Sequence, residues 1–296
     1  MPMVGPVVSP KSSDGKGIDM AVADQAAWET SPIASDWTID ELMIACLADC
    51  FEDGDQACNG MASFLPVSAF NLARLTHAPG LVWLAGALGL EPRPVEVPAS
   101  TLEAPLWRDA VMYVEQYGDF WNLALNGRWL QKFCVGAAQL DRFGNANNSV
   151  IGSDYHHPKV RLPGTAGLGD MGSIGKKLYY WNPNLNPRAL VDRVDFVSCA
   201  GFLGGGQERS DLGLEGGPEL VVTNLAVLDF EPVSKHMRIR SVHPGVTVDQ
   251  VQEATGFELL LPEGEIPTTK EPSQAQVDII RAFDPKNMRK REFRNR

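Results

Sequence analysis

Apolar residues recur at every third or fourth position between residues 39 and 51, and this period predicts one amphipathic helix there. Thr38 and Glu41 stand three positions apart at its start, which is the spacing of a capping box. Upstream, Pro, Ser, Gly and Asp are frequent and no apolar period is found. We therefore expect residues 1–34 to form a disordered arm and residues 35–296 to form a single domain.

The next apolar segments predict a strand at 56–58, a helix at 66–75 and a second strand at 81–84. This order is that of a βαβ unit, which places the two strands parallel in one sheet and the helix on its face. The apolar run 129–138 is typical of a central strand that is buried on both faces. The sequence therefore predicts the α/β class, with a mostly parallel sheet and helices on both faces.

Further along the chain, apolar runs predict more elements, whereas one central stretch is rich in loops. We expect helices at 105–123, 247–255 and 273–283, and strands at 194–198, 220–223 and 227–230. Residues 139–175 are dense in Gly, Asn, Asp and His and contain few apolar residues. Because binding residues are concentrated on loops that a rigid scaffold positions, we expect the functional site in this stretch.

The charge balance is acidic, since 26 Lys and Arg against 37 Asp and Glu give a formal net charge of -11. This charge repels phosphate groups, so neither nucleic acid nor an anionic membrane is expected as a partner. No apolar stretch approaches the roughly 18 residues of a membrane span, and no signal peptide is evident, so we expect a cytoplasmic protein. The five cysteines lie mostly within apolar runs and are expected to be buried thiols in a reducing compartment.

Polar residues directly follow the predicted strand 129–138, and Gln139, Asp141, Arg142 and Asn145 are candidates for a ligand pocket. Ligands of open parallel sheets bind at the carboxyl ends of the strands, which is where these residues would lie. Gly and Asn in the same segment favour tight turns and a close approach of the backbone to a ligand. The alternative is that Asp141, Gly144 and Asn145 only close a turn.

A glycine-rich segment comes next, in which Gly164, Gly167, Gly169 and Asp170 are further candidates. The backbone amides of such a loop can hold an anion or a thioester carbonyl. The segment lacks the spacing and the lysine of a nucleotide P-loop. Taken alone, its composition does not define a function.

Other reactive residue types do not form a site that can be assigned. The adjacent His156 and His157 would point to opposite faces of an extended strand, and no second cluster completes a coordination shell, so no metal is expected. A G-x-S-x-G elbow is absent, and Cys134 and Cys199 lack a partner arrangement of His and Asn. The basic run that starts at Arg289 is expected to be a solvated tail or to pair with a partner subunit.

Several segments carry a resemblance to a known family: GAAQLDRFGNANNS, IGSDYHHPKVRLPGTAG, ELVVTNLAVLDF, HPGVTVDQVQEATGFEL and IRAFDPKNMRKRE. In this order they resemble the β-subunit of family I coenzyme A transferases over residues 38–291. DYHHPK, together with VEVP at 95–98, resembles the β-subunit of glutaconate CoA-transferase. The C-terminal third resembles the β-subunit of the cholesterol ring-cleaving CoA-ester hydrolases of steroid-degrading bacteria.

The resemblance implies a NagB/RpiA/CoA-transferase-like fold and an α-subunit of similar fold, in a heterodimer or an α2β2 heterotetramer. It also implies an active site at the subunit interface, with the loop from Gly164 to Gly172 near the acyl-CoA. Coenzyme A would be part of the substrate, and no bound cofactor is expected. In the transferases of this family, the β-subunit carries a glutamate after the second strand, which attacks the thioester.

The corresponding stretch of this chain has Ala85, Gly86 and Ala87 and contains no carboxylate. The resemblance therefore implies no certain catalytic residue in this chain. It favours the hydrolases, in which a glutamate of the α-subunit is the base and water opens the ring of a cyclic-diketone-type acyl-CoA during steroid degradation. Two alternatives stay open: the β-subunit of a genuine CoA-transferase of the glutaconate or 3-oxoacid type, in which Glu91 or an unaligned acid serves, and a non-catalytic structural subunit.

Overall fold

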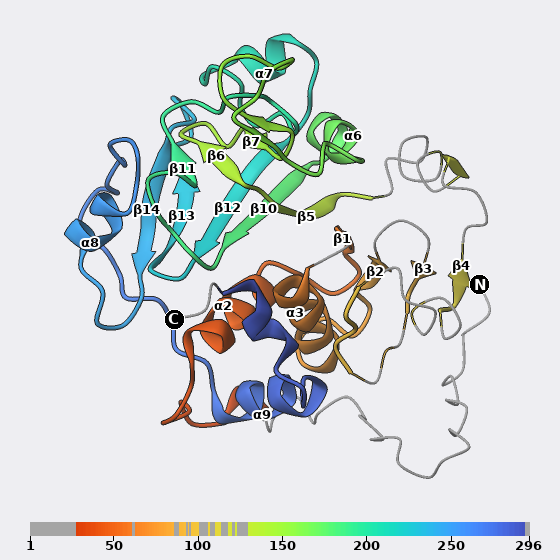
Figure 1. Ribbon diagram of the computed structural model, residues 1–296. Helices are drawn as coiled ribbons and strands as arrows, with labels where there is room; N and C mark the ends of the chain where they lie inside the picture. The colour runs from red at the N-terminus through yellow and green to blue at the C-terminus, as the bar shows by residue number, and fades with distance from the viewer. Residues whose placement is uncertain are drawn as a thin grey trace.

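The computed structural model describes residues 28–60, 63–85 and 130–293, together with the pieces 89–92, 94, 96–100, 106, 110–113, 118, 119 and 122. A nine-stranded sheet crosses these described residues in the order β14-β13-β12-β10-β5-β1-β2-β3-β4. Figure 1 shows this sheet between two layers. In chain order its strands are β1 (Gln56–Asn59), β2 (Val82–Ala85), β3 (Gly89–Leu90), β4 (Met112–Tyr113), β5 (Lys132–Gly136), β10 (Lys177–Asn182), β12 (Gly217–Thr223), β13 (Ala226–Phe230) and β14 (Met237–Val242).

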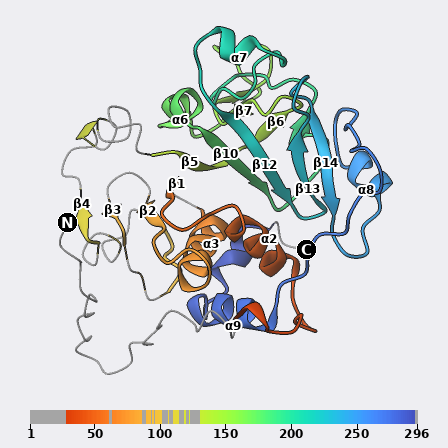
Figure 2. The ribbon, with the colours of Figure 1, turned by 180° about the vertical axis from the view of Figure 1, so that it is seen from behind.

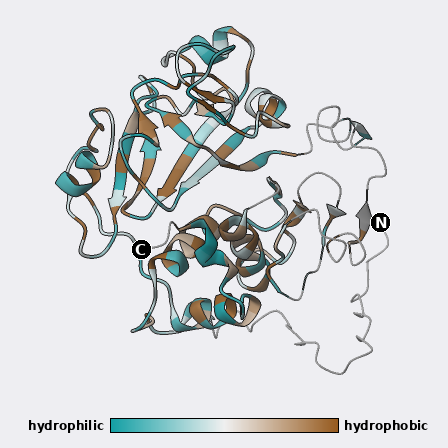
Figure 3. Cartoon of the chain, viewed as in Figure 1, coloured by the Kyte–Doolittle hydropathy of each residue, from teal (hydrophilic) through white to brown (hydrophobic). Residues whose placement is uncertain are grey.

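The five central strands β2, β1, β5, β10 and β12 pair in parallel, and the strands at both edges pair antiparallel. The α/β class with a large, mostly parallel sheet is therefore confirmed. Apolar residues concentrate in the central strands and on the helices beside them (Figure 3). This distribution is expected for strands that are covered on both faces.

One face of the sheet is covered by the helices α2 (Ile39–Ala48), α3 (Phe64–Leu75) and α9 (Gln274–Phe283) and by the 3-10 helix η1 (Met288–Glu292). Large side chains such as Phe51, Phe70 and Trp83 form the core between these helices and the sheet. The capping box at the start of α2 is confirmed, since the Glu41 carboxylate accepts a hydrogen bond of 2.9 Å from the Thr38 backbone N–H.

The other face carries a loop-rich layer with a small sheet of β11 (Leu190–Val191), β6 (Gln139–Asp141) and β7 (Ala146–Asn147). The hairpin β8 (Val150–Ile151) and β9 (Val160–Arg161) and the short helices α6 (Leu168–Ile174), α7 (Glu208–Asp211) and α8 (Val248–Glu253) accompany it. Met171 of α6 and Val251 of α8 reach a second core on this face. Figure 2 shows the same separation of α2, α3 and α9 from α6 and α7 from behind.

Most predicted elements that the described residues test are confirmed within a few residues, and one is wrong. Residues 194–198 form no strand, because their backbone bonds to the neighbouring turn: the Val194 backbone bonds to the Asp141 carboxylate, and the Ser198 N–H donates to the Ala146 carbonyl (2.8 Å). The expected helix at 105–123 lies mostly outside the described residues, and its described part includes the strand β4. Four strands of the large sheet, β3, β4, β10 and β14, were not predicted.

The predicted N-terminal arm has a described portion, residues 28–34, and this portion packs on α9. Ile33 forms a bridge with Ser273, and the Ala34 backbone N–H donates a hydrogen bond of 3.1 Å to the Pro272 carbonyl. Residues 1–27 lie outside the described residues, so their disorder stays a prediction. In the described part of the chain, no helix is long and apolar enough to cross a membrane.

Candidate active site at the carboxyl edge of the sheet

The carboxyl ends of the central parallel strands meet at one edge of the sheet, which we call the carboxyl edge. Asn59 at the end of β1 is paired with Ala85 of β2 on one side and Cys134 of β5 on the other. Farther along β5, Gly136 is paired with Trp181 of β10. In open α/β sheets, this edge is where ligands bind.

Ala85 ends β2 and is fully buried on the face that α3 covers. The neighbouring Asn59 is also fully buried, and its side-chain oxygen accepts a hydrogen bond of 2.6 Å from the Trp83 indole N–H. Ala85 itself has no group that can act as a nucleophile. The other two residues of the expected nucleophile segment, Gly86 and Ala87, lie outside the described residues.

Glu91, the alternative nucleophile, lies away from the carboxyl edge. Leu84 is paired with Leu90, and the Glu91 backbone N–H donates a hydrogen bond of 2.7 Å to the Trp83 carbonyl. Glu91 is thus level with Trp83, two residues back from Ala85, or about 7 Å at the usual rise of a strand. Its φ of 48° is in the left-handed region, which is uncommon for a residue other than glycine.

Asp141 and Asn145 lie together in the turn that joins β6 to β7. The Asp141 carboxylate accepts hydrogen bonds from the backbone N–H of Phe143 and from the backbone and side chain of Asn145. The Asn145 side chain also bonds to the backbone of Gly201 and Leu203. Burial raises the pKa of Asp141, although these hydrogen bonds oppose the shift. Both side chains are buried and fully engaged in holding two loops together, as the turn-closing alternative predicts.

Gln139 and Arg142 likewise contact other parts of the same layer. Gln139 is buried, and its amide group donates a hydrogen bond of 3.1 Å to the Asp195 carboxylate. Arg142 forms an ion pair with Asp192, and its guanidinium lies over the Phe257 ring, 5.6 Å from the ring centroid. These contacts connect β6 to the segments after β11 and α8.

The glycine loop, residues 164–170, is held at the end of β5 by a residue that the sequence did not single out. Asn148 donates from its side chain to the Gly136 carbonyl (2.6 Å), and its own carbonyl accepts from the Gly164 N–H (2.8 Å). Ala166 has a φ of 43°, a strained conformation of a kind that is frequent at functional sites.

The remaining candidates of this loop are open to one side. A Cβ atom added at Gly164 or Gly169 would meet nothing within 4 Å. Gly167 precedes α6, and Asp170 lies exposed in its first turn. The structure therefore brings the loop to the carboxyl edge and leaves space beside it, while Asp141 and Asn145 lie in the layer behind.

Glu292 is a carboxyl group at this edge that the sequence analysis did not identify. Its carboxylate accepts a hydrogen bond of 3.0 Å from the Leu65 N–H in the first turn of α3, and another from the Trp181 indole N–H. Burial raises the pKa of Glu292 to about 7, although hydrogen bonds from Leu65, Trp181 and Phe64 oppose the shift. No local motif marks this residue, because the contact spans 227 positions of the sequence.

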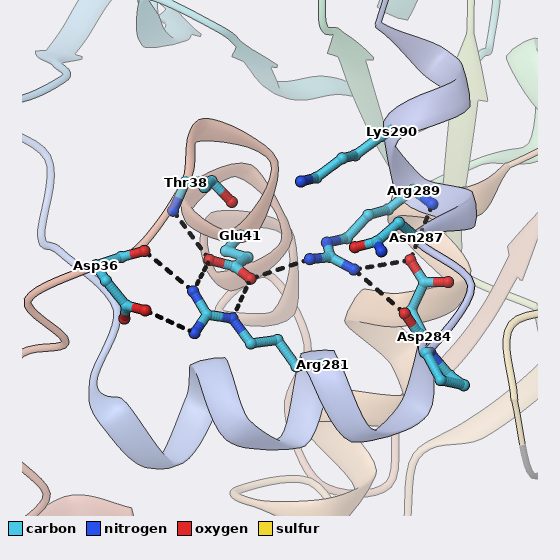
Figure 4. Close-up of a pocket in the computed structure, with 9 residues that line it drawn as sticks. Asp36, Thr38, Glu41, Arg281, Asp284, Asn287, Arg289 and Lys290 are labelled. Carbon is cyan, nitrogen blue, oxygen red and sulfur yellow. Dashed lines mark hydrogen bonds and ion pairs between the residues drawn. The ribbon is translucent and has the colours of Figure 1, made fainter.

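A separate cavity of about 360 Å³ lies between α2, α9 and η1 (Figure 4). Arg289 is 3% exposed and bonds to Asp40, Glu41 and Asp284. Burial alone would raise the pKa of Glu41, but hydrogen bonds from Arg281 and Thr38 outweigh it, so this pKa is lowered. The positive charges of Arg281 and Arg289 are thus balanced by neighbouring carboxylates. The expectation of a solvated tail or a partner contact was wrong for Arg289, which is buried in its own chain.

His157 pairs only with Asp154, at 3.0 Å, on an exposed hairpin. Within the ranges that the structure describes, no three His, Cys, Asp or Glu residues come together as metal ligands would. Burial raises the pKa of every cysteine thiol, which is the condition of an inert thiol rather than a nucleophile.

The fold and the carboxyl edge agree with a comparison to protein families, in which residues 41–254 match coenzyme A transferase. The chain belongs to this family. Among curated relatives, it is similar to the β-subunit of 3-oxoadipate CoA-transferase of Pseudomonas knackmussii, with 33% identity over 253 residues, 84% of this chain and 94% of the relative. It is also similar to the cholesterol ring-cleaving hydrolase IpdB subunit of Rhodococcus jostii, with 31% identity over 263 residues, 84% of this chain and 93% of the relative.

Solved structures give the same picture. Glutaconate coenzyme A-transferase from Acidaminococcus fermentans superimposes with a TM-score of 0.76 at 27% identity, over 85% of this chain and 96% of the other. IpdAB of Rhodococcus jostii superimposes with a TM-score of 0.73 at 28% identity, over 88% of this chain and 100% of the other. The resemblance to the β-subunits of this family is confirmed.

Proposed function

We propose that this chain is the β-subunit of a two-subunit enzyme that hydrolyses a carbon–carbon bond in the ring of an acyl-CoA. The observation that carries the proposal is the segment of Ala85, Gly86 and Ala87 at the end of β2, which contains no carboxylate where the resemblance places the nucleophilic glutamate of the transferases. Glu91 does not replace that glutamate, because strand register holds it level with Trp83. A covalent acyl-enzyme on this strand therefore has no carboxylate to form it.

A hydrolytic reaction needs a base to activate water. We propose that a carboxylate of an α-subunit is this base, at the interface of a heterodimer or an α2β2 heterotetramer. Similarity to the IpdB subunits, which are named as cholesterol ring-cleaving hydrolases, supports this choice. The substrate class that follows is a cyclic-diketone-type acyl-CoA of steroid degradation. Coenzyme A enters only as part of the substrate.

We further propose that the glycine loop contacts the acyl-CoA. Its backbone amides lie beside the end of β5, and the space next to Gly164 and Gly169 is open. Asp141 and Asn145 would support this surface from behind rather than touch the substrate, because their polar groups are already bonded.

The test is to purify the full chain with its partner subunit and incubate the complex with a cyclic-diketone acyl-CoA and an excess of free carboxylic acids. Mass spectrometry then follows the CoA products in ¹⁸O-labelled water. A ring-opened product that retains CoA and contains one labelled oxygen supports hydrolysis. New CoA esters of the added acids would establish transfer and refute the proposal.

A variant in the glycine loop tests whether this subunit contributes to substrate binding and turnover. Gly169→Leu adds a side chain where nothing lies within 4 Å, so the complex should fold normally and bind acyl-CoA more weakly. Unchanged turnover and KM in this variant would indicate a structural subunit instead.

A further inference from the structure

The carboxylate of Glu292 is held in place from three sides. One oxygen accepts from the Leu65 N–H, the other accepts from the Trp181 indole, and the Phe64 N–H is a third donor. The helix η1 that carries Glu292 is fixed in turn by Arg289, whose bond to Asp284 is drawn in Figure 4. The residue as a whole is half-buried.

Glu292 lies on the same face and at the same edge of the sheet as Ala85. Ala85 and Trp181 both belong to the core that α2 and α3 cover. The strands β1 and β5 lie between β2, which carries Ala85, and β10, which carries Trp181. At the usual spacing of strands, the backbones of these two residues are therefore about 14 Å apart. The Trp181 ring lies over Gly136 of β5, where a Cβ atom would be only 3.1 Å from it. The Trp181 ring and the first turn of α3, which follows β1, therefore hold Glu292 between β2 and β10.

The surroundings suit a group that exchanges protons. A carboxylate has about four lone-pair positions, so three N–H donors leave one for a proton or a substrate atom. Burial keeps the pKa of Glu292 near 7, so that both its acid and its base form are populated at neutral pH. The other carboxyl groups close to η1, those of Asp40, Glu41 and Asp284, are paired with Arg289.

We infer that Glu292 is the acid–base carboxyl group that this subunit itself contributes to the reaction. It lies at the same edge of the sheet as Ala85, a residue that has no carboxyl group. This inference rests on the proposed function. The partner's carboxylate removes a proton from water, and the water oxygen adds to a ring carbonyl. The ring C–C bond then breaks, its electron pair passes to the neighbouring carbon as an enolate, and the acid form of Glu292 protonates that carbon. A proton from the partner's carboxyl group then returns to Glu292 through solvent.

The first test uses the complex of the full chain with its partner subunit and an acyl-CoA that this complex hydrolyses. Glu292→Gln should lower kcat by roughly 10²–10⁴-fold, leave KM nearly unchanged and remove the ionisation near neutral pH from the kcat profile. Glu292→Asp should restore part of the rate. The matched control is Glu271→Gln, since Glu271 accepts a similar hydrogen bond of 2.8 Å from the Trp37 indole away from the edge. Equal kcat values and pH profiles in the two Gln variants would overturn the inference.

The second test does not need turnover, so it separates this inference from the proposed function. The complex is labelled with 5-fluorotryptophan, and the Trp181 resonance is assigned with Trp181→Phe. This resonance should titrate near neutral pH, should lose that titration in Glu292→Gln, and should shift when acetyl-CoA is added as a probe. A complex that hydrolyses no acyl-CoA but shows these shifts would refute the proposed function alone. A Trp181 signal that moves with neither pH nor acetyl-CoA would refute the role of Glu292.

Discussion

Replacing Arg289 with methionine should destabilise the protein strongly, because it leaves buried carboxylates without a cation. Arg289 bonds to Asp284 at 2.9 Å and to Glu41 at 3.1 Å, and it also contacts Asp40. These acidic side chains are at most 6% exposed, so solvent screens them little. Glu41 keeps Arg281, whereas Asp40 and Asp284 lose their ion pairs. Breaking a buried pair in this way costs about 3–5 kcal/mol, and we expect a value near 3 kcal/mol.

The assay is urea unfolding of Arg289→Met beside Lys290→Met, which removes an exposed cation from the next position. Arg289→Met should lose far more stability than Lys290→Met, because only Arg289→Met leaves buried carboxylates without a cation. Two variants within 1 kcal/mol of each other would refute this account of the network.

Three further predictions concern packing, pH and thiols. Gly201→Ala should destabilise by about 2 kcal/mol or more in urea unfolding, since its Cβ would lie 2.3 Å from the Gly144 carbonyl, whereas Gly169→Ala in α6 should be neutral or slightly stabilising. Because burial raises the pKa of Glu292 from 4.5 to about 7, the folded state binds the extra proton between these values, and stability should fall as pH rises through this window. The loss is on the order of 3 kcal/mol and should be absent in Glu292→Gln but present in Glu271→Gln. The native protein should react with a thiol reagent such as DTNB at pH 7.5 far more slowly than the denatured protein, which should expose five thiols. Half-buried Cys46 should be the first to react, and fast labelling of more than one thiol in the native state would contradict the burial of the other four.

The parts of the fold that follow from local patterns could be predicted, and those that depend on distant partners could not. The helix α2 and the unit β1, α3 and β2 carry their own periodicity, and α2 has its own capping box, so their positions were confirmed. The segment Val194–Ser198 has the composition of a strand, but Asp195 and Ser198 bond to Gln139 and Ser149, and these tertiary contacts override propensity.

The candidate site shows the same division. The residues after β5 were found because Gly, Asn and Asp at a strand end have a local meaning, and the structure resolves them into a loop at the edge and a turn behind it. Glu292 stands in a basic run, and nothing within that run indicates that its carboxylate lies at the start of a helix more than two hundred positions earlier. Only the folded chain brings the two together.

The position of η1 in the chain has a consequence for the order of biosynthesis. Arg289 binds the first turn of α2 and Glu292 binds the first turn of α3, yet η1 is the last of the described elements that the ribosome makes. The sheet and the helices α2 and α3 can form earlier. The carboxylates in the first turn of α2 and the backbone N–H groups in the first turn of α3 stay without these partners until Arg289 and Glu292 emerge from the ribosome. A nascent or prematurely terminated chain that lacks these residues would therefore present an incomplete edge.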